Sequence, residues 1–143
     1  MDRTVWLTLG KKKHPLRFSY ATTEFIEEKY GDYDGMVEAL TKGDHKIRET
    51  LDIVTVLNHQ ACAWLNNYNS DLPKQRGADV DDDGNYIPLD REFLANSLDR
   101  DSYSTLLEAI TEAFVKSRKN EIEGTPTAEA KKQKKRTESS QIN

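Results

Sequence analysis

The sequence predicts a mostly helical α+β fold in which a small N-terminal β-hairpin packs on a bundle of about four to five helices. Alternating apolar residues occupy positions 5–9 and 16–20, on either side of the basic segment 10–15. Apolar residues then recur at helical spacing through most of the chain as far as residue 118. At 143 residues the chain has the usual length of one soluble domain, about 100 to 150 residues.

The N-terminal part predicts a hairpin over residues 4–20 that leads directly into an acidic helix over residues 22–30. The apolar positions of this helix are Phe25, Ile26 and Tyr30. Gly31 is placed to end the helix in a left-handed conformation, and Asp34 is placed to cap the next one. That next helix is short and is predicted over residues 35–42.

A long apolar helix is predicted over residues 45–67, with Asp44 as its N-cap. Its apolar residues form two neighbouring stripes. The first stripe is Ile47, Leu51, Val54, Ala61, Leu65 and Tyr68, and the second is Ile53, Leu57 and Trp64. Burial of each Leu, Ile or Val contributes about 1.5 to 3 kcal/mol, which outweighs a penalty of at most about 0.7 kcal/mol for a β-branched residue in a helix. The stripes therefore predict a central helix that is surrounded on most sides.

Residues 69–87 are rich in Asn, Asp, Gly and Pro and predict a long loop. A short helix over residues 89–98 follows, and then a last amphipathic helix over residues 101–118, capped by Asp99 or Asp101. The apolar residues of these two helices are Phe93, Leu94 and Leu98 in the first, and Tyr103, Leu106, Leu107, Ile110, Ala113 and Phe114 in the second.

We place a single globular domain over residues 1–119 and a disordered basic tail over residues 120–143, because the tail has almost no apolar surface to offset chain entropy. Residues 115–143 carry a net charge of +4, so the body carries −8 of the total of −4. An acidic body is poorly suited to nucleic acid. We expect neither a signal peptide nor a membrane span, which needs about 20 apolar residues. The single cysteine, Cys62, indicates a core residue in a reducing cytosol.

The acidic loop contains the sharpest local motif of the chain. Five residues match ligand positions of an EF-hand calcium loop around a glycine turn, and they are Asp79, Asp81, Asp83, Asn85 and Asp90. The last position is usually glutamate, and aspartate has a shorter arm. An EF-hand also needs a regular incoming helix, which Pro73 and Gly77 interrupt. A solvated, mobile acidic loop is the competing interpretation.

The sequence contains no Walker loop, dinucleotide-binding turn, nucleophile elbow or zinc-protease helix. His14, His45 and His59 are too scattered to predict a metal site. We therefore expect a protein that is not an enzyme and that has no cofactor. The basic run at residues 131–136 would attract nucleic acid electrostatically, but it lacks interleaved aromatic residues that stack on bases.

The order of parts resembles the tail assembly chaperones of long-tailed bacteriophages and related prophages. The resemblance is carried by the Phe18-Ser19-Tyr20 exit of the hairpin, the acidic first helix up to Gly31, the long apolar helix, the amphipathic last helix and the polar tail. It covers residues 4–119 as architecture, and its motifs are concentrated before residue 40. The long acidic loop departs from the more compact members of the family.

The resemblance implies a non-structural morphogenesis factor in the cytoplasm of the bacterial host. Such a protein binds the tape measure protein and keeps it soluble until tail tube subunits assemble around it. It also implies contact with the tail tube protein and a longer product made by programmed ribosomal frameshifting. Lysine-rich coding near residues 131–135 is where slippery codons would lie. Independently of the resemblance, a binder that lines a long apolar partner with many copies would self-associate, so we expect a homo-oligomer.

Two rival hypotheses belong to other classes. The first is a calcium-binding interaction module that uses the loop at residues 79–90, and added calcium would then raise the melting temperature. The second is a small nucleic-acid-associated protein acting through residues 131–136, and its retention on DNA or RNA would then fall steeply with salt.

Overall fold

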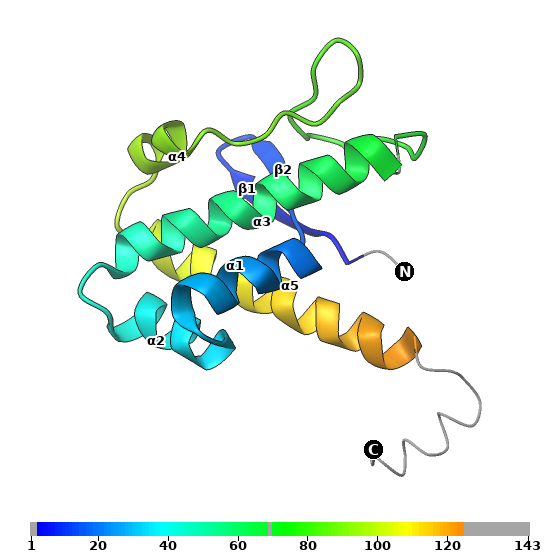
Figure 1. Ribbon diagram of the computed structural model, residues 1–143. Coiled ribbons are helices and arrows are strands. Elements are labelled where there is room, and N and C mark those ends of the chain that lie inside the picture. Colours follow the sequence, from blue (N-terminus) through cyan, green and yellow to red (C-terminus); the bar gives the residue numbers. More distant parts are fainter. Residues whose placement is uncertain (1–2, 69, 125–143) are drawn as a thin grey trace.

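A computed structural model describes residues 3–68 and 70–124, with the backbone alone for residues 119–124 (Figure 1). The elements within these residues are β1 (Val5–Leu9), β2 (Lys12–Leu16), α1 (Tyr20–Tyr30), α2 (Tyr33–Lys42), α3 (Lys46–Tyr68), α4 (Arg91–Ser97) and α5 (Ser102–Gly124). The hairpin packs against the helices, which confirms the predicted α+β, mostly helical class. No described helix combines the length and the hydropathy that a bilayer crossing needs.

The N-terminal hairpin has a tighter turn than the sequence predicts. β1 and β2 pair antiparallel through a turn formed by Gly10 and Lys11. Gly10 has a φ of 63°, the left-handed conformation that such short hairpin turns favour. The prediction of a second strand over residues 16–20 is wrong, because residues 12–16 pair with β1 and Tyr20 already begins α1.

The first two helices are separated by a short turn at Gly31. This glycine ends α1 with a φ of 89°, as predicted. The predicted cap of the following helix is wrong: the carboxylate of Asp32 accepts a hydrogen bond from the backbone N–H of Gly35 at 2.7 Å. Asp34 lies in the first turn instead, because α2 begins at Tyr33.

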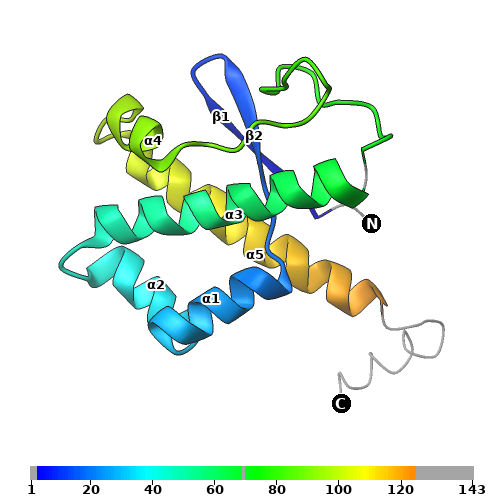
Figure 2. The same ribbon diagram turned by 45° about the horizontal axis from the view of Figure 1, so that its top comes forward.

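Helix α3 is the central element and packs against α1, α2, α4, α5 and β2 (Figure 2). Both predicted stripes are buried along its middle, and the residues concerned are Leu51, Ile53, Val54, Leu57, Ala61 and Leu65. The prediction is wrong at both ends of the first stripe, because Ile47 is 52% exposed and Tyr68 is 78% exposed. They lie in the first and last turns of α3. The helix starts at Lys46 rather than at residue 45.

The last two helices keep their predicted order but not their bounds. Leu94 of α4 is buried against the core, whereas Phe93 is 59% exposed, because this seven-residue helix turns only one side toward α3. The buried face of α5 is as predicted and includes Leu106, Ile110 and Ala113. Helix α5 continues to Gly124, so the predicted end near residue 118 and disorder from residue 120 are wrong there. The rest of the predicted tail, with the basic run at residues 131–136, lies outside the described residues.

The segment between α3 and α4 folds back onto the hairpin. The backbone N–H of Lys13 in β2 donates to the carbonyl of Gly77 at 2.9 Å. The side chain of Asn66, near the end of α3, binds both backbone groups of Tyr86. It accepts from the Tyr86 N–H at 2.8 Å and donates to the Tyr86 carbonyl at 3.1 Å. An α3 side chain thus holds this segment as a neighbouring strand would.

A second asparagine of α3 ties the same segment to the hairpin. Asn58 is fully buried, donates to the carbonyl of Pro15 at 3.0 Å and accepts from the N–H of Leu89 at 2.7 Å. His59 Nε2 lies 2.7 Å from the carbonyl of Leu89. These contacts are inconsistent with a freely solvated loop over the described part of the segment.

Candidate functional site

A groove lined by aromatic residues lies where the start of α1, the C-terminal half of α3 and the end of α5 come together. Figure 1 shows the first turn of α1 between α3 and α5. The groove encloses about 700 Å³. We call it the aromatic groove and define it by Arg3, Arg17, Tyr20, Trp64, Tyr68 and Ser117.

The inner part of the groove is a stacked pair of side chains. The guanidinium carbon of Arg17 lies 3.6 Å from the centroid of the Trp64 ring, a cation–π contact. Arg17 is placed there because its backbone N–H donates to the carbonyl of Leu57 on α3 at 3.1 Å. The segment between β2 and α1 is therefore fixed to α3. The stacked side chains of Arg17 and Trp64 form a preorganised surface.

The rim of the groove carries two tyrosines that the fold leaves in water. Tyr20 is 89% exposed and Tyr68 is 78% exposed. Tyr20 points out because Ser19 starts α1 with a capping box, in which the side chains of Ser19 and Thr22 bind each other's backbone N–H. Tyr68 lies in the last turn of α3. Tyrosine and tryptophan are enriched in protein interfaces, so this arrangement suits contact with another polypeptide.

The groove also differs in charge from the rest of the domain. Within the described part of the chain, its lining includes Arg3 and Arg17 and no aspartate or glutamate. The body outside the last 29 residues carries a net charge of −8. A groove lined by two arginines on such a body gives a local electrostatic difference that a partner would sense.

Comparisons of the chain with protein-family models, with curated proteins and with solved structures find no match.

The predicted calcium loop forms a compact turn. The carboxylate of Asp81 accepts hydrogen bonds from the backbone N–H groups of Asp83 and Asn85, each at 2.9 Å. The backbone of Asp81 also pairs with that of Asn85 at 2.9 Å, and Gly84 has a φ of 84°. Such a side-chain-to-backbone turn stabilises a loop without an ion.

The other two predicted calcium ligands point to separate partners. Asp79 pairs with Lys12 of the hairpin at 3.0 Å. Asp90 caps α4, since its carboxylate accepts from the N–H of Phe93 at 2.9 Å. Among the described residues, no group of three or more His, Cys, Asp or Glu side chains is arranged to bind a metal ion.

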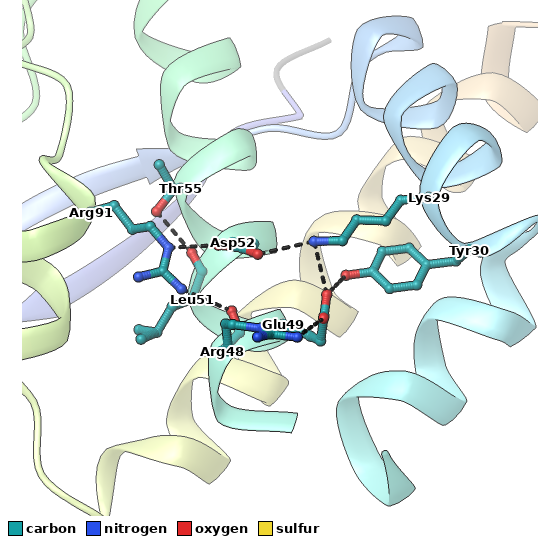
Figure 3. Close-up of polar contacts among 8 residues, drawn as sticks. All are labelled: Lys29, Tyr30, Arg48, Glu49, Leu51, Asp52, Thr55 and Arg91. Atoms are coloured by element: carbon teal, nitrogen blue, oxygen red, sulfur yellow. Dashed lines mark hydrogen bonds and ion pairs between the residues drawn. The ribbon is translucent and has the colours of Figure 1, made fainter. Parts of the chain in front are cut away.

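A network of charged side chains joins α1, α3 and α4 on another face (Figure 3). Lys29 of α1 lies 2.9 Å from Glu49 and 3.0 Å from Asp52, both on α3. Asp52 also accepts from Arg91 of α4, and Glu49 accepts from Tyr30. Burial raises the pKa of Asp52, but hydrogen bonds from Lys29 and Arg91 outweigh it and bring the pKa below its usual value.

We expect Asp52→Asn to lower the free energy of unfolding at pH 7 by about 1 kcal/mol, because Lys29 and Arg91 are about a third exposed and water compensates part of the loss. The pKa of Asp52 is lowered on folding, so its contribution is present above the ordinary pKa of 3.8 and is lost as the pH falls through the folded value. Urea unfolding at pH 7 and pH 3 measures this. Asp82→Asn, on an exposed loop position, is the control, and an equal effect of both variants would contradict the account.

A separate cavity of about 550 Å³ lies between the hairpin, α4 and α5, and His14 of β2 lines it. His14 is only 4% exposed, and its Nδ1 has no hydrogen-bond partner among the described residues. Burial lowers the pKa of His14. The Asp79 carboxylate opposes this effect, and Lys12 adds to it. The folded state therefore favours the neutral imidazole.

Stability should fall in mildly acidic solution because of His14. Its pKa is lower in the folded than in the unfolded state, so its stabilising contribution is complete above the ordinary value of 6.5 and is lost as the pH falls through the folded pKa. Melting temperatures between pH 5 and 8 measure the slope. His14→Asn should flatten it, whereas His45→Asn, at an exposed position before α3, should leave it unchanged. A slope that persists in His14→Asn would exclude His14 as its cause.

The single cysteine lies in a small second core next to the groove. Cys62 is buried with Leu65 and Tyr86, and Trp6 and Trp64 pack against this cluster. Burial raises the pKa of the Cys62 thiol to about 11, although a hydrogen bond with Asn58 lowers it in part. The thiol therefore stays protonated at neutral pH, and the prediction of a core residue is confirmed.

The aromatic groove could not be predicted from the sequence, and no partner-binding residue was identified there. Its residues come from four separate segments, and only the fold brings them together. Tyr68 was predicted as part of a buried stripe, and Tyr20 as the end of a strand. The sequence signal that would have pointed to Tyr20 is Ser19, followed three residues later by Thr22, a pattern that can begin a helix.

Proposed function

We propose that this chain is a tail assembly chaperone of a long-tailed bacteriophage or prophage. In this proposal it acts in the cytoplasm of the bacterial host, binds the tape measure protein and keeps it soluble while the tail tube forms. It catalyses no reaction and is absent from the finished particle. The observation that carries the proposal is the aromatic groove, a preformed concave surface with exposed tyrosines on a small, acidic, mostly helical body.

The physical argument starts from what such a chaperone must do. A tape measure protein is long and helical, and its apolar surface aggregates until the tail tube covers it. A protein that shields this surface needs apolar contact area of its own and a charged exterior that keeps the complex in solution. Tyr20 and Tyr68 supply rigid contact area, and the net charge of −8 on the body supplies the repulsion between complexes.

Many copies would be needed to cover a long partner, so the proposal includes self-association along it. Other exposed apolar side chains lie outside the groove, on α3, α4 and α5, and they are Ile47, Phe93 and Val115. Ile47 lines a smaller pocket between α3, α4 and α5, and Phe93 lines the cavity beside His14. They are available for contacts between neighbouring copies, and the tail tube protein is a further proposed partner.

Co-expression tests the proposal. The chain is produced together with the large helical protein encoded beside it, and the soluble fraction of that protein is measured with and without the chain. We expect the large protein to become soluble and to be retained on an affinity-tagged chain. If it remains insoluble and no complex is captured, the proposal is wrong.

A further inference from the structure

We propose that the aromatic groove takes an acidic segment of its partner polypeptide, anchored by one large apolar side chain. This inference rests on the proposed function, because it specifies the partner chemistry that the groove would select. It is carried by three observations on one surface: the charge of the lining, the orientation of α1 and the exposed rings.

The lining of the groove favours negative charge. Among the residues whose side chains the structure describes, it contains Arg3 and Arg17 and no acidic residue. Ser117 of α5 also lines it, and the neighbours of Ser117 in sequence are the basic residues Lys116 and Arg118. Lys116 is fixed toward the N-terminal segment, since its Nζ donates to the carbonyl of Thr4 at 3.0 Å. Lys116 and Arg118 do not line the groove themselves, so the basic residues of its described lining are Arg3 and Arg17, while the body as a whole carries −8.

The direction of α1 adds to this preference. Its first turn lines the groove at Tyr20, Ala21 and Thr23, so the N-terminal end of an eleven-residue helix faces the same space. The N-terminus of a helix carries a partial positive charge and stabilises a nearby carboxylate. An acidic side chain of a partner would therefore meet the helix end and Arg3 together.

The rings supply the apolar part of the site. Trp64 is backed by the guanidinium of Arg17, and the exposed rings of Tyr20 and Tyr68 form the rim. A Phe, Trp or Leu side chain inserted among them would remove these rings from water and gain the area-dependent hydrophobic free energy. A partner with acidic residues around one such anchor fits both the charge and the shape.

A peptide fits this surface better than a nucleic acid. Aromatic rings beside arginines also bind single-stranded RNA, but a polyanion would extend beyond the groove over a body of charge −8. A short acidic segment places only a few charges at the basic patch. RNA binding is therefore an outcome of the test that would overturn the proposal.

Fluorescence anisotropy with the full chain tests the inference. One labelled probe is a 16-residue amphipathic peptide with Leu and one Phe on the apolar face and Glu on the other. A second probe has Lys in place of every Glu, and a third is a 15-nucleotide uridine RNA. We expect the acidic peptide to bind at least tenfold more tightly than the basic peptide, and its affinity to fall with added salt.

Substitutions inside and outside the aromatic groove test whether the acidic peptide binds there. Arg3→Glu and the double variant Tyr20→Ser, Tyr68→Ser should each weaken binding of the acidic peptide at least tenfold, with unchanged circular dichroism. Phe93→Ser, an exposed ring on α4, should leave it unchanged. Equal binding of the acidic and basic peptides, preferential binding of the RNA, or no effect of the groove variants would each overturn the inference.

The peptide-binding experiment and the co-expression experiment test the two proposals separately. If the large helical protein becomes soluble but the acidic peptide does not bind, the chaperone function stands and the acidic selectivity is wrong. If the acidic peptide binds in the groove but the large protein stays insoluble, the groove chemistry stands and the chaperone function is wrong.

Discussion

Replacing Asn58 with alanine lowers the free energy of unfolding by about 3 kcal/mol, because two buried backbone groups lose their hydrogen-bond partner at once. The side chain is fully buried and joins the carbonyl of Pro15 to the N–H of Leu89. An unsatisfied buried polar group costs about 1 to 3 kcal/mol, and water does not reach this one. Urea unfolding followed by circular dichroism measures the change.

Asn67→Ala is the matched control for Asn58→Ala. It makes the same change of helix propensity in the same helix, at an exposed position. We expect stability to be unchanged or slightly raised by this control. Asn66→Ala should have an intermediate effect of about 1 kcal/mol, since its bonds to Tyr86 are only partly buried and water can replace them. A loss below about 0.5 kcal/mol for Asn58→Ala would refute the bridging role.

The double variant Tyr20→Ser, Tyr68→Ser should weaken partner binding about 100-fold without loss of stability. Interface residues that matter for binding contribute more than about 1 kcal/mol each, and two contributions of about 1.4 kcal/mol together correspond to a 100-fold change in Kd. Both rings are more than three-quarters exposed in the free domain, so the fold does not depend on them. Titration of the variant against a soluble helical fragment of the large neighbouring protein gives the Kd.

Phe93→Ser is the control for this experiment, because it removes an exposed ring of similar size from α4, outside the groove. We expect its Kd to equal that of the unaltered chain. If Phe93→Ser weakens binding as much as the tyrosine variant does, the partner uses a different or wider surface. If neither variant changes the Kd, the aromatic groove is not the binding site.

Helical periodicity was sufficient to predict the centre of the core. Leu51, Val54 and Leu57 recur at spacings of three residues, and burial of such residues outweighs the poor helix propensity of their β-branched neighbours. The ends of elements were less predictable. Whether Ile47 or Tyr68 is covered depends on which other elements reach the ends of α3, and no pattern within α3 carries that information.

The strand register and the position of the loop depended on contacts distant in sequence. The sequence predicts Lys12 and Lys13 as turn residues. They belong to β2 instead, because the left-handed Gly10 allows a shorter turn. A signal for Asn58 was present, since it lies four residues after Val54 and three before Ala61, on the buried stripe. A polar residue on such a stripe predicts a buried hydrogen bond, but its partners, 31 and 43 residues away, are defined only by the fold.

Suppression of aggregation with purified components tests most directly whether this chain shields another polypeptide. The large helical protein encoded beside it is diluted from denaturant, and light scattering is followed with increasing amounts of the chain. We predict that the unaltered chain suppresses scattering at several copies per partner, and that Tyr20→Ser, Tyr68→Ser does not. Scattering that is unchanged by the unaltered chain at every ratio would contradict the account.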